Sequence, residues 1–192
     1  MTANVDQGAA QQARAATANA FAVATDAIQQ QQNQFLNQNR TQISTFLYQY
    51  LQTEITYNNA SNRAAWFLEH RYESPQRSKN VIPVLQGVSL SKSDLLAHPA
   101  YTNFLKIYLL YSYLPEDLSR YKTHYPLYEI VENKYSGKPK YYLQKELMVD
   151  VFNRSGEVAF AQKHFRDFVN QNPYPAYTEA IQNVYGLSLI HI

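Results

Sequence analysis

The stretch 93-SDLLAHPAYTNFLKIYLLYSYL-114 is the most apolar and most aromatic run of this 192-residue sequence. Four of its aromatic residues recur at spacings of three and four, which places them on one face of a helix: Tyr101, Phe104, Tyr108 and Tyr111. Pro99 lies where the first helical turn needs no backbone donor, and Pro115 ends the pattern. Apolar residues occupy nearly every side, so the stretch predicts a buried helix that other helices must cover.

Composition and charge favour a helical protein and argue against a dedicated nucleic-acid-binding one. The chain has 17 Lys and Arg residues against 15 Asp and Glu residues, a formal net charge of +2. Because nucleic-acid-binding domains concentrate basic charge on one face, we expect no nucleic-acid partner. Five glycines are few for a sheet fold with many tight turns. The 17 tyrosines and 9 phenylalanines supply large rings for packing between helices.

The absence of cysteine excludes a disulfide framework and a thiolate metal site within these residues. No apolar run reaches the length of a membrane-spanning helix, so we expect no membrane span. The Ala-rich start lacks the basic opening and the leucine-rich core of a signal peptide. We therefore expect either that the mature protein is not exported or that its true beginning is missing.

Residues 1–57 are expected to form N-terminal Ala/Gln-rich helices that are partly flexible. The stretch from Thr2 to Gln34 is predicted to form one helix with a thin apolar stripe, because Phe21, Ile28 and Phe35 recur every seven residues. The glutamine run that follows Ile28 leaves a flexible low-complexity tract open as the alternative.

A second helix is predicted from Phe35 to Tyr57, where Asn58 and Asn59 end it. Its apolar residues recur at helical spacing: Ile43, Phe46, Leu47, Tyr50, Leu51 and Ile55. Ser61 is then expected to cap a third helix, because a serine side chain can accept a hydrogen bond from a free backbone donor of the first turn.

The stretch 73–93 is predicted to be irregular, because Pro83 interrupts its apolar part and favours a short docked turn over a strand. Four further helices are predicted after the aromatic stretch: 127–135, 141–152, 157–170 and 176–185. Ser136, Gly137 and Pro139 have the composition of a turn between the first two of these helices.

Asn172, Pro173 and Pro175 interrupt the helical pattern before the last helix. The two helices before them, joined by a short link, are expected to pack antiparallel. The final residues LSLIHI, 187–192, continue no pattern and are expected to be a non-native tail, which leaves 58–186 as the helical domain. The fold class predicted for the whole chain is all-α: an irregular array of antiparallel helices around a central aromatic helix.

No catalytic, cofactor-binding or metal-ligating residue is predicted. A catalytic zinc site needs three converging ligands, but the histidines share no helical turn and no carboxylate pair at ligand spacing: His70, His98, His124, His164 and His191. Phosphate-loop, dinucleotide-binding and nucleophile-elbow motifs are absent from the sequence. The adjacent Glu116 and Asp117 favour a helix N-terminus through its dipole, and the alternative of a general acid–base pair lacks a partner.

The segment from Lys134 to Lys145, KYSGKPKYYLQK, interleaves lysine with tyrosine. Stacking and positive charge in this pattern could bind single-stranded nucleic acid. The small net charge instead favours a solvated turn that leads into a helix whose tyrosines face the core.

Three successive segments resemble the helical region before the thioredoxin-fold domain of TlpA/ResA-like thiol–disulfide oxidoreductases of the bacterial envelope: DLLAHPAYTNFLKIYLLYSYL, YYLQKELMVDVFNRSG and AQKHFRDFVNQNPYPAYTEAIQNVYG. The resemblance covers residues 59–186 and rests on helix order and aromatic spacing. It implies that the chain is a fragment, with a signal segment missing in front and a redoxin domain missing behind. The two cysteines of that family, separated by two residues, have no counterpart here, so no catalytic residue is carried over.

The resemblance implies a non-catalytic accessory region in the periplasm or cell envelope, whose partner is another protein or the missing redoxin domain. Two alternatives stay open. One is a stand-alone helical scaffold that binds a protein or peptide in a groove between helices. The other is an enzyme with a site between helices, which would show convergent polar groups in a pocket.

Overall fold

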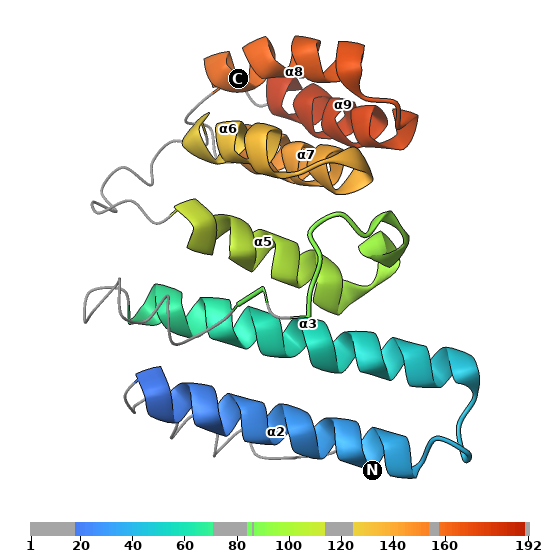
Figure 1. The fold of residues 1–192 in the computed structure, drawn as a ribbon. Helices are drawn as coiled ribbons and strands as arrows, with labels where there is room; N and C mark the ends of the chain where they lie inside the picture. Colours follow the sequence, from blue (N-terminus) through green and yellow to red (C-terminus); the bar gives the residue numbers. More distant parts are fainter. Residues whose placement is uncertain (1–17, 71–83, 86, 114–124, 154–157, 191–192) are drawn as a thin grey trace. The chain divides into compact units, whose positions relative to one another are not determined.

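A computed structural model describes residues 18–70, 84–85, 87–113, 125–153 and 158–190. All regular structure in these residues is helical, as Figure 1 shows, and the all-α prediction is confirmed. The described part contains seven α-helices and one 3-10 helix: α2 (Ala18–Gln38), α3 (Thr45–Glu69), η1 (Ser93–Ala97), α5 (Pro99–Tyr113), α6 (Tyr125–Lys134), α7 (Gly137–Asn153), α8 (Val158–Gln171) and α9 (Pro175–Ile190).

The chain divides into two compact units that are not simply consecutive in sequence. The first unit consists of residues 1–89 and 97–111, and it contains α2, α3 and most of α5. The second consists of residues 90–96 and 112–192, and it contains α6 to α9.

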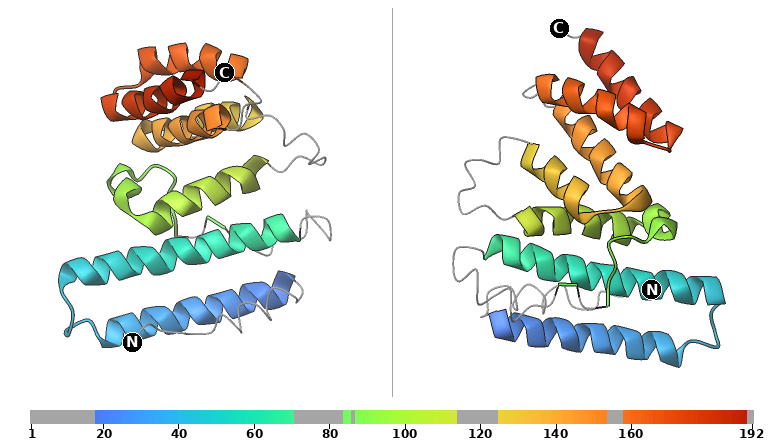
Figure 2. Two further views of the ribbon diagram at one scale, coloured as in Figure 1. Left: turned by 180° about the vertical axis from the view of Figure 1, so that it is seen from behind. Right: turned by 45° about the horizontal axis from the view of Figure 1, so that its top comes forward.

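The first unit is built on α2 and α3, which lie side by side in each view of Figures 1 and 2. Phe21 of α2 stacks on Trp66 of α3, with ring centroids 5.1 Å apart. Nearer the connection, Leu36 is also buried. Between these apolar contacts, Asn59 Nδ2 donates a hydrogen bond to Gln32 Oε1 over 3.2 Å. Apolar packing and polar pairing therefore alternate along this interface.

The predicted second helix, from Phe35 to Tyr57, is wrong at its start. Phe35 belongs to α2, and α3 begins only at Thr45, where the Ser44 hydroxyl accepts a hydrogen bond from the Leu47 amide over 3.1 Å. The predicted apolar stripe is also wrong in part, because Phe35 and Phe46 are 69% and 77% exposed. The spacing of the apolar residues predicts which of them share a helical face, but it does not predict whether another helix covers that face.

The predicted break at Asn58 and Asn59 is wrong, and Ser61 is not a cap. α3 continues through all three residues, and Asn59 and Ser61 are buried within it. The Asn59 carboxamide donates to the Ile55 carbonyl over 2.8 Å as well as to Gln32. These partners satisfy a side chain that would otherwise favour a helix end, so packing overrides the local preference.

The aromatic helix is confirmed as α5, which begins at the predicted Pro99. Tyr57 of α3 contacts two of its buried rings, Tyr101 at 4.9 Å and Phe104 at 5.5 Å between centroids. Further along, Phe67 meets Tyr111 edge-on at 5.0 Å. The predicted aromatic face of α5 is therefore the face that packs on α3.

The second unit has its own core, formed by residues from each of the four α-helices that the structure describes there. Its buried members come from α6, α7, α8 and α9: Tyr128, Met148, Val151, Phe152, Phe168 and Ile181. Tyr141 extends this core through an edge contact with Phe168, at 6.1 Å between centroids. Asn172 caps the break before α9, since its Oδ1 accepts from the Tyr174 amide over 3.0 Å. The predicted break between α8 and α9 is thus confirmed.

The predicted turn at Ser136, Gly137 and Pro139 is wrong in part, because α7 already begins at Gly137. Gly137 has a φ of 60°, a left-handed conformation that suits glycine, and the chain changes direction there. Pro139 follows within the first turn, where the missing amide is not needed, and its ring is buried.

α9 continues beyond the predicted end at residue 185 and reaches Ile190, so part of the LSLIHI segment is helical. The expectation of a non-native tail at 187–192 stays a prediction. Several other predictions concern residues outside the described ranges: the helix before Ala18, the docked turn around Pro83, the carboxylates Glu116 and Asp117, the link at 154–156, and His124 and His191.

Candidate functional site

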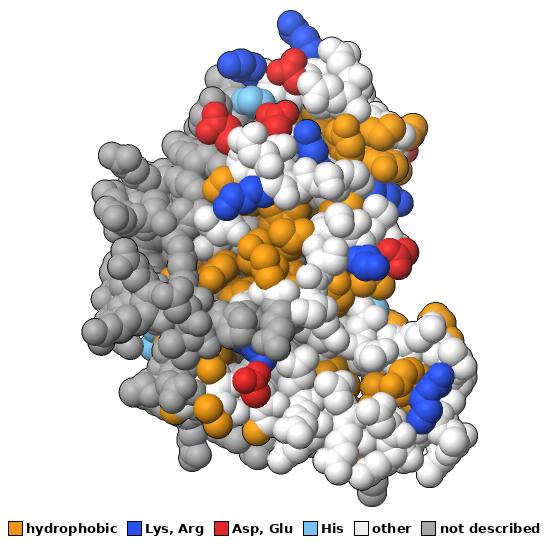
Figure 3. Space-filling model, viewed as in Figure 1, with side chains coloured by type: hydrophobic (Ala, Val, Ile, Leu, Met, Phe, Trp, Pro, Cys, Tyr) orange, Lys and Arg blue, Asp and Glu red, His pale blue; other side chains and the backbone are white. Residues whose placement is uncertain are grey.

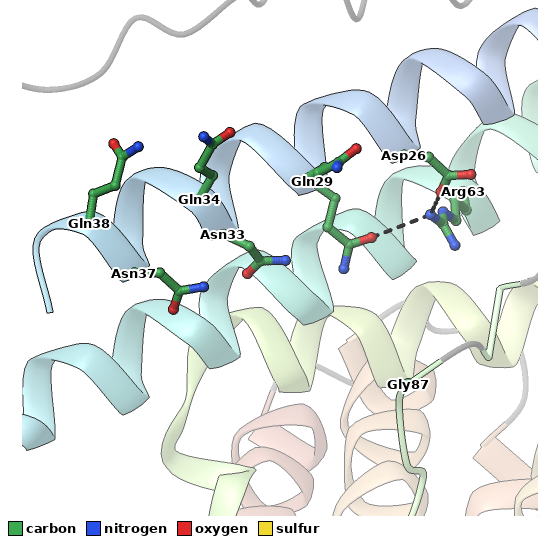
Figure 4. Close-up of a pocket in the computed structure, with 9 residues that line it drawn as sticks. Asp26, Gln29, Asn33, Gln34, Asn37, Gln38, Arg63 and Gly87 are labelled. Atoms are coloured by element: carbon green, nitrogen blue, oxygen red, sulfur yellow. Dashed lines mark hydrogen bonds and ion pairs between the residues drawn. The ribbon is translucent and has the colours of Figure 1, made fainter.

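The first unit carries an open polar groove of about 950 Å³, which we call the amide groove. Seven of its lining residues come from the exposed side of α2, one from α3 and one from the segment before η1: Asp26, Gln29, Gln30, Asn33, Gln34, Asn37, Gln38, Arg63 and Gly87. Figure 4 shows the side chains of α2 projecting in two rows, with Asn33 and Asn37 in one row and Gln34 and Gln38 in the other.

The sequence builds this groove through helical periodicity. The lining positions of α2 fall at 26, 29–30, 33–34 and 37–38, one step of three or four residues per turn. The opposite side of α2 carries Phe21, Thr25 and Leu36, which are buried. A single amphipathic helix therefore presents an apolar side to α3 and a carboxamide side to the groove.

An ion pair between a buried guanidinium and an exposed carboxylate lies at one end of the amide groove. The Arg63 guanidinium, on a side chain only 6% exposed, donates to the Asp26 carboxylate, which belongs to a side chain 63% exposed. Arg63 Nη2 also donates to Gln29 Oε1 over 3.3 Å. Among the described lining residues, the one cation and the one anion pair with each other.

The carboxamides of the groove are only partly used by the protein. Asn37 Oδ1 accepts a hydrogen bond from the Tyr48 hydroxyl over 2.7 Å, and Gln29 accepts from Arg63. Gln30, Asn33, Gln34 and Gln38 make no side-chain hydrogen bond with the residues that the structure describes. Each of these four side chains keeps two donors and an acceptor for solvent or a ligand.

A group of exposed hydrophobic side chains lies at the end of the first unit where the connection joins α2 to α3. Phe35, Phe46, Leu47 and Tyr50 are exposed there, and Figure 3 shows hydrophobic atoms at the surface over this region. The Phe46 and Tyr50 rings are 6.5 Å apart between centroids. We call these four residues the apolar end of the first unit.

Two histidines have structural roles in the first unit. His70 ends α3, with Nδ1 2.9 Å from the Trp66 carbonyl and its ring stacked on Trp66 at 4.3 Å. His98 precedes α5, with Nε2 3.2 Å from the Tyr50 carbonyl and 3.7 Å from Glu54 Oε2. Its ring lies 4.3 Å from the Tyr50 ring, so His98 fastens the start of α5 to α3.

The remaining described histidine, His164, lies against the Tyr128 ring at 4.7 Å between centroids. Burial lowers the pKa of His164, and the neighbouring Lys163 lowers it further. Among the described residues, no three His, Asp or Glu side chains gather as a metal site would require.

Burial also raises the pKa values of three tyrosines: Tyr111 in the first unit, and Tyr128 and Tyr177 in the second. In each case desolvation of the phenolate is the leading cause. These shifts keep the hydroxyls protonated, and they do not by themselves supply an acid, a base or a nucleophile.

The lysine–tyrosine segment from Lys134 to Lys145 forms contacts within the second unit. Lys145 lies over the Tyr142 ring at 4.8 Å and also pairs with Glu146. Lys138 lies over the Tyr174 ring at 5.5 Å. These cation–π contacts engage the lysines with rings of their own unit. The expected absence of a nucleic-acid partner stays a prediction.

No helix in the described ranges combines the length and the apolar character that crossing a bilayer requires. Sequence reasoning predicted the helix that carries the amide groove but not the groove itself. The available signal was the recurrence of Asn and Gln at helical spacing on the side of α2 opposite Phe21. No protein-family model, curated protein or solved structure matches this chain.

Proposed function

We propose that this chain is a non-catalytic helical accessory region of an envelope thioredoxin-like thiol–disulfide oxidoreductase. The observation that carries the proposal is the order of helices after Ser89. The aromatic helix α5 is followed first by α6 and then by α7, α8 and α9. The resemblance rests on three segments that contain parts of α5, α7, α8 and α9. In this proposal a cysteine thiolate outside the chain performs the exchange chemistry, and the helices contact the polypeptide that it acts on.

The uninterrupted reading frame on both sides of this chain tests the proposal directly. We expect a signal segment in front and, soon after Gly186, a pair of cysteines separated by two residues within a strand–helix unit. A short, cysteine-free extension after Gly186 would contradict the proposal.

A kinetic comparison then tests the accessory role. The full-length oxidoreductase and a version without residues 18–186 would be assayed with a protein disulfide and with a small aromatic disulfide. Loss of the helices should slow reduction of the protein disulfide and leave reduction of the small disulfide unaffected. Only the protein substrate is large enough to contact the helical region while its disulfide reacts. This role would be refuted if the two protein versions reduced the protein disulfide at the same rate.

The second candidate function is a stand-alone helical scaffold that binds another protein, and the apolar end of the first unit favours it. Phe46 and Phe35 are the most exposed large hydrophobic side chains described. Exposed aromatic residues grouped at one place often mark a protein contact. A Phe46→Ser variant that keeps its fold and still captures the same partner as the parent chain would exclude this candidate.

A further inference from the structure

The amide groove has the dimensions of a site for a short length of extended chain. From Asp26 to Gln38 the lining covers 12 residue steps of α2, which corresponds to about 18 Å along the helix axis. An extended polypeptide advances by about 3.3 Å per residue, so about five residues would fit along this length. The groove is open rather than enclosed, which allows a chain to enter without a free end.

The chemistry of the lining favours a peptide backbone over other polymers. A carboxamide offers a carbonyl acceptor beside an amide donor, the same pair of groups that every peptide bond offers in return. The described lining holds no aromatic ring on which a sugar or a base could stack. Arg63 and Asp26, the charged residues of the described lining, are paired with each other, so neither is a free counter-charge for a charged ligand.

Asn33 provides a further reason to regard the carboxamides as more than a solvated helix surface. Asparagine is a poorer helix former than glutamine or alanine, so Asn33 in the middle of α2 lowers helix stability. Its side chain makes no hydrogen bond with the described residues that could offset this loss. Glutamine would keep such a surface soluble equally well.

We propose that the amide groove binds an extended, uncharged polypeptide segment by hydrogen bonds to its backbone. Gln30, Asn33, Gln34 and Gln38 donate to peptide carbonyls and accept from peptide amides, while Arg63 and Asp26 form one end of the site. Recognition through the backbone tolerates many side-chain sequences. The inference does not depend on the proposed redox neighbour, because the site lies within the first unit of this chain.

NMR spectra of the side-chain amides of the full 192-residue chain provide the test. The probe is a capped octapeptide of alternating serine and threonine, and the control ligand is a capped octaproline, which lacks backbone N–H donors. We expect the serine–threonine peptide to shift the side-chain NH₂ signals of Asn33 and Gln34, and the octaproline to shift them far less. A linear maltooligosaccharide serves as the carbohydrate comparison.

Matched variants separate the site from a general surface effect. The double variant Asn33→Ala/Gln34→Ala should bind the peptide about tenfold more weakly or worse, because two carboxamides lose their hydrogen bonds. The control Gln31→Ala/Gln49→Ala removes two exposed carboxamides outside the groove and should leave the affinity unchanged. Both variants place alanine in a helix, so both should fold.

Three outcomes would overturn the inference. The first is the absence of shifts with the serine–threonine peptide at millimolar concentration. The second is an equal loss of affinity in the double variant and in its control. The third is a stronger response to the maltooligosaccharide than to the peptide, which would make the groove a carbohydrate site.

Discussion

Phe21 of α2 stacks on Trp66 of α3 with the ring planes only 17° apart, and both side chains are buried. Replacing Phe21 with alanine should lower the free energy of unfolding by about 3 to 4 kcal/mol, since it removes buried area and leaves a cavity. Urea-induced unfolding would measure the loss. Phe35→Ala, in the same helix but at an exposed position, should change stability by less than about 0.5 kcal/mol. Similar losses in the two variants would show that α2 packs differently.

The continuity of α3 can be tested at Asn62. Were Ser61 a cap, Asn62 would be the first residue of a new helix, a position where proline is favoured. Because Asn62 instead lies inside α3 and is exposed, Asn62→Pro should cost about 3 kcal/mol or more through the backbone alone. Asn62→Ala is the control and should be neutral or slightly stabilising. Thermal unfolding measures the loss. If Asn62→Pro were as stable as the parent chain, a helix boundary at Ser61 would be supported after all.

The burial of Arg63 makes its pairing with Asp26 energetically important to the first unit. Asp26→Asn should lower the free energy of unfolding by about 1 to 2 kcal/mol, because the buried Arg63 guanidinium would lose the charge of one carboxylate partner. Arg63→Met retains an apolar stem and removes the charge, so Asp26→Asn should cost much less in that background. Additive losses in this double-mutant cycle would show that the two side chains do not interact.

His164 should make stability depend on pH in the weakly acidic range. Burial lowers its pKa in the folded state, so the unfolded chain binds more protons when the pH falls below the ordinary histidine value, about 6.5. Stability should therefore decrease on acidification from about pH 7.5 to about pH 5. The His164→Gln variant should show a smaller decrease in urea-unfolding midpoint over the same range. Parallel pH profiles for the variant and the parent would exclude His164 as the cause.

Proline and aromatic spacing made α5 and the break between α8 and α9 predictable from the sequence. Pro99 fixed a helix start, Pro173 and Pro175 marked a break, and the spacing from Tyr101 to Tyr111 identified the face that packs on α3. These signals are local, because proline acts through its own ring and missing amide, and a helical face follows from spacing alone.

The mistakes arose where a distant residue changed the local preference. Asn59 favours a helix end by its local preference, but within α3 it donates a hydrogen bond to Gln32, 27 residues earlier. Phe46 looked like a core residue, but no described helix covers it. The sequence contains the periodic polar side of α2, but it does not reveal the amide groove, because Arg63 and Gly87 from other parts of the chain also line it.

The chain passes between its two units at residues 89–90, 96–97 and 111–112, and this has a consequence for dissecting the protein. A single proteolytic nick or stop codon cannot release either unit whole. A polypeptide that ends at residue 89 loses the rings of α5 that cover Tyr57, and one that begins at residue 112 loses 90–96. Isolating the first unit would require joining residue 89 to residue 97 through a bridging peptide in place of the excised heptapeptide.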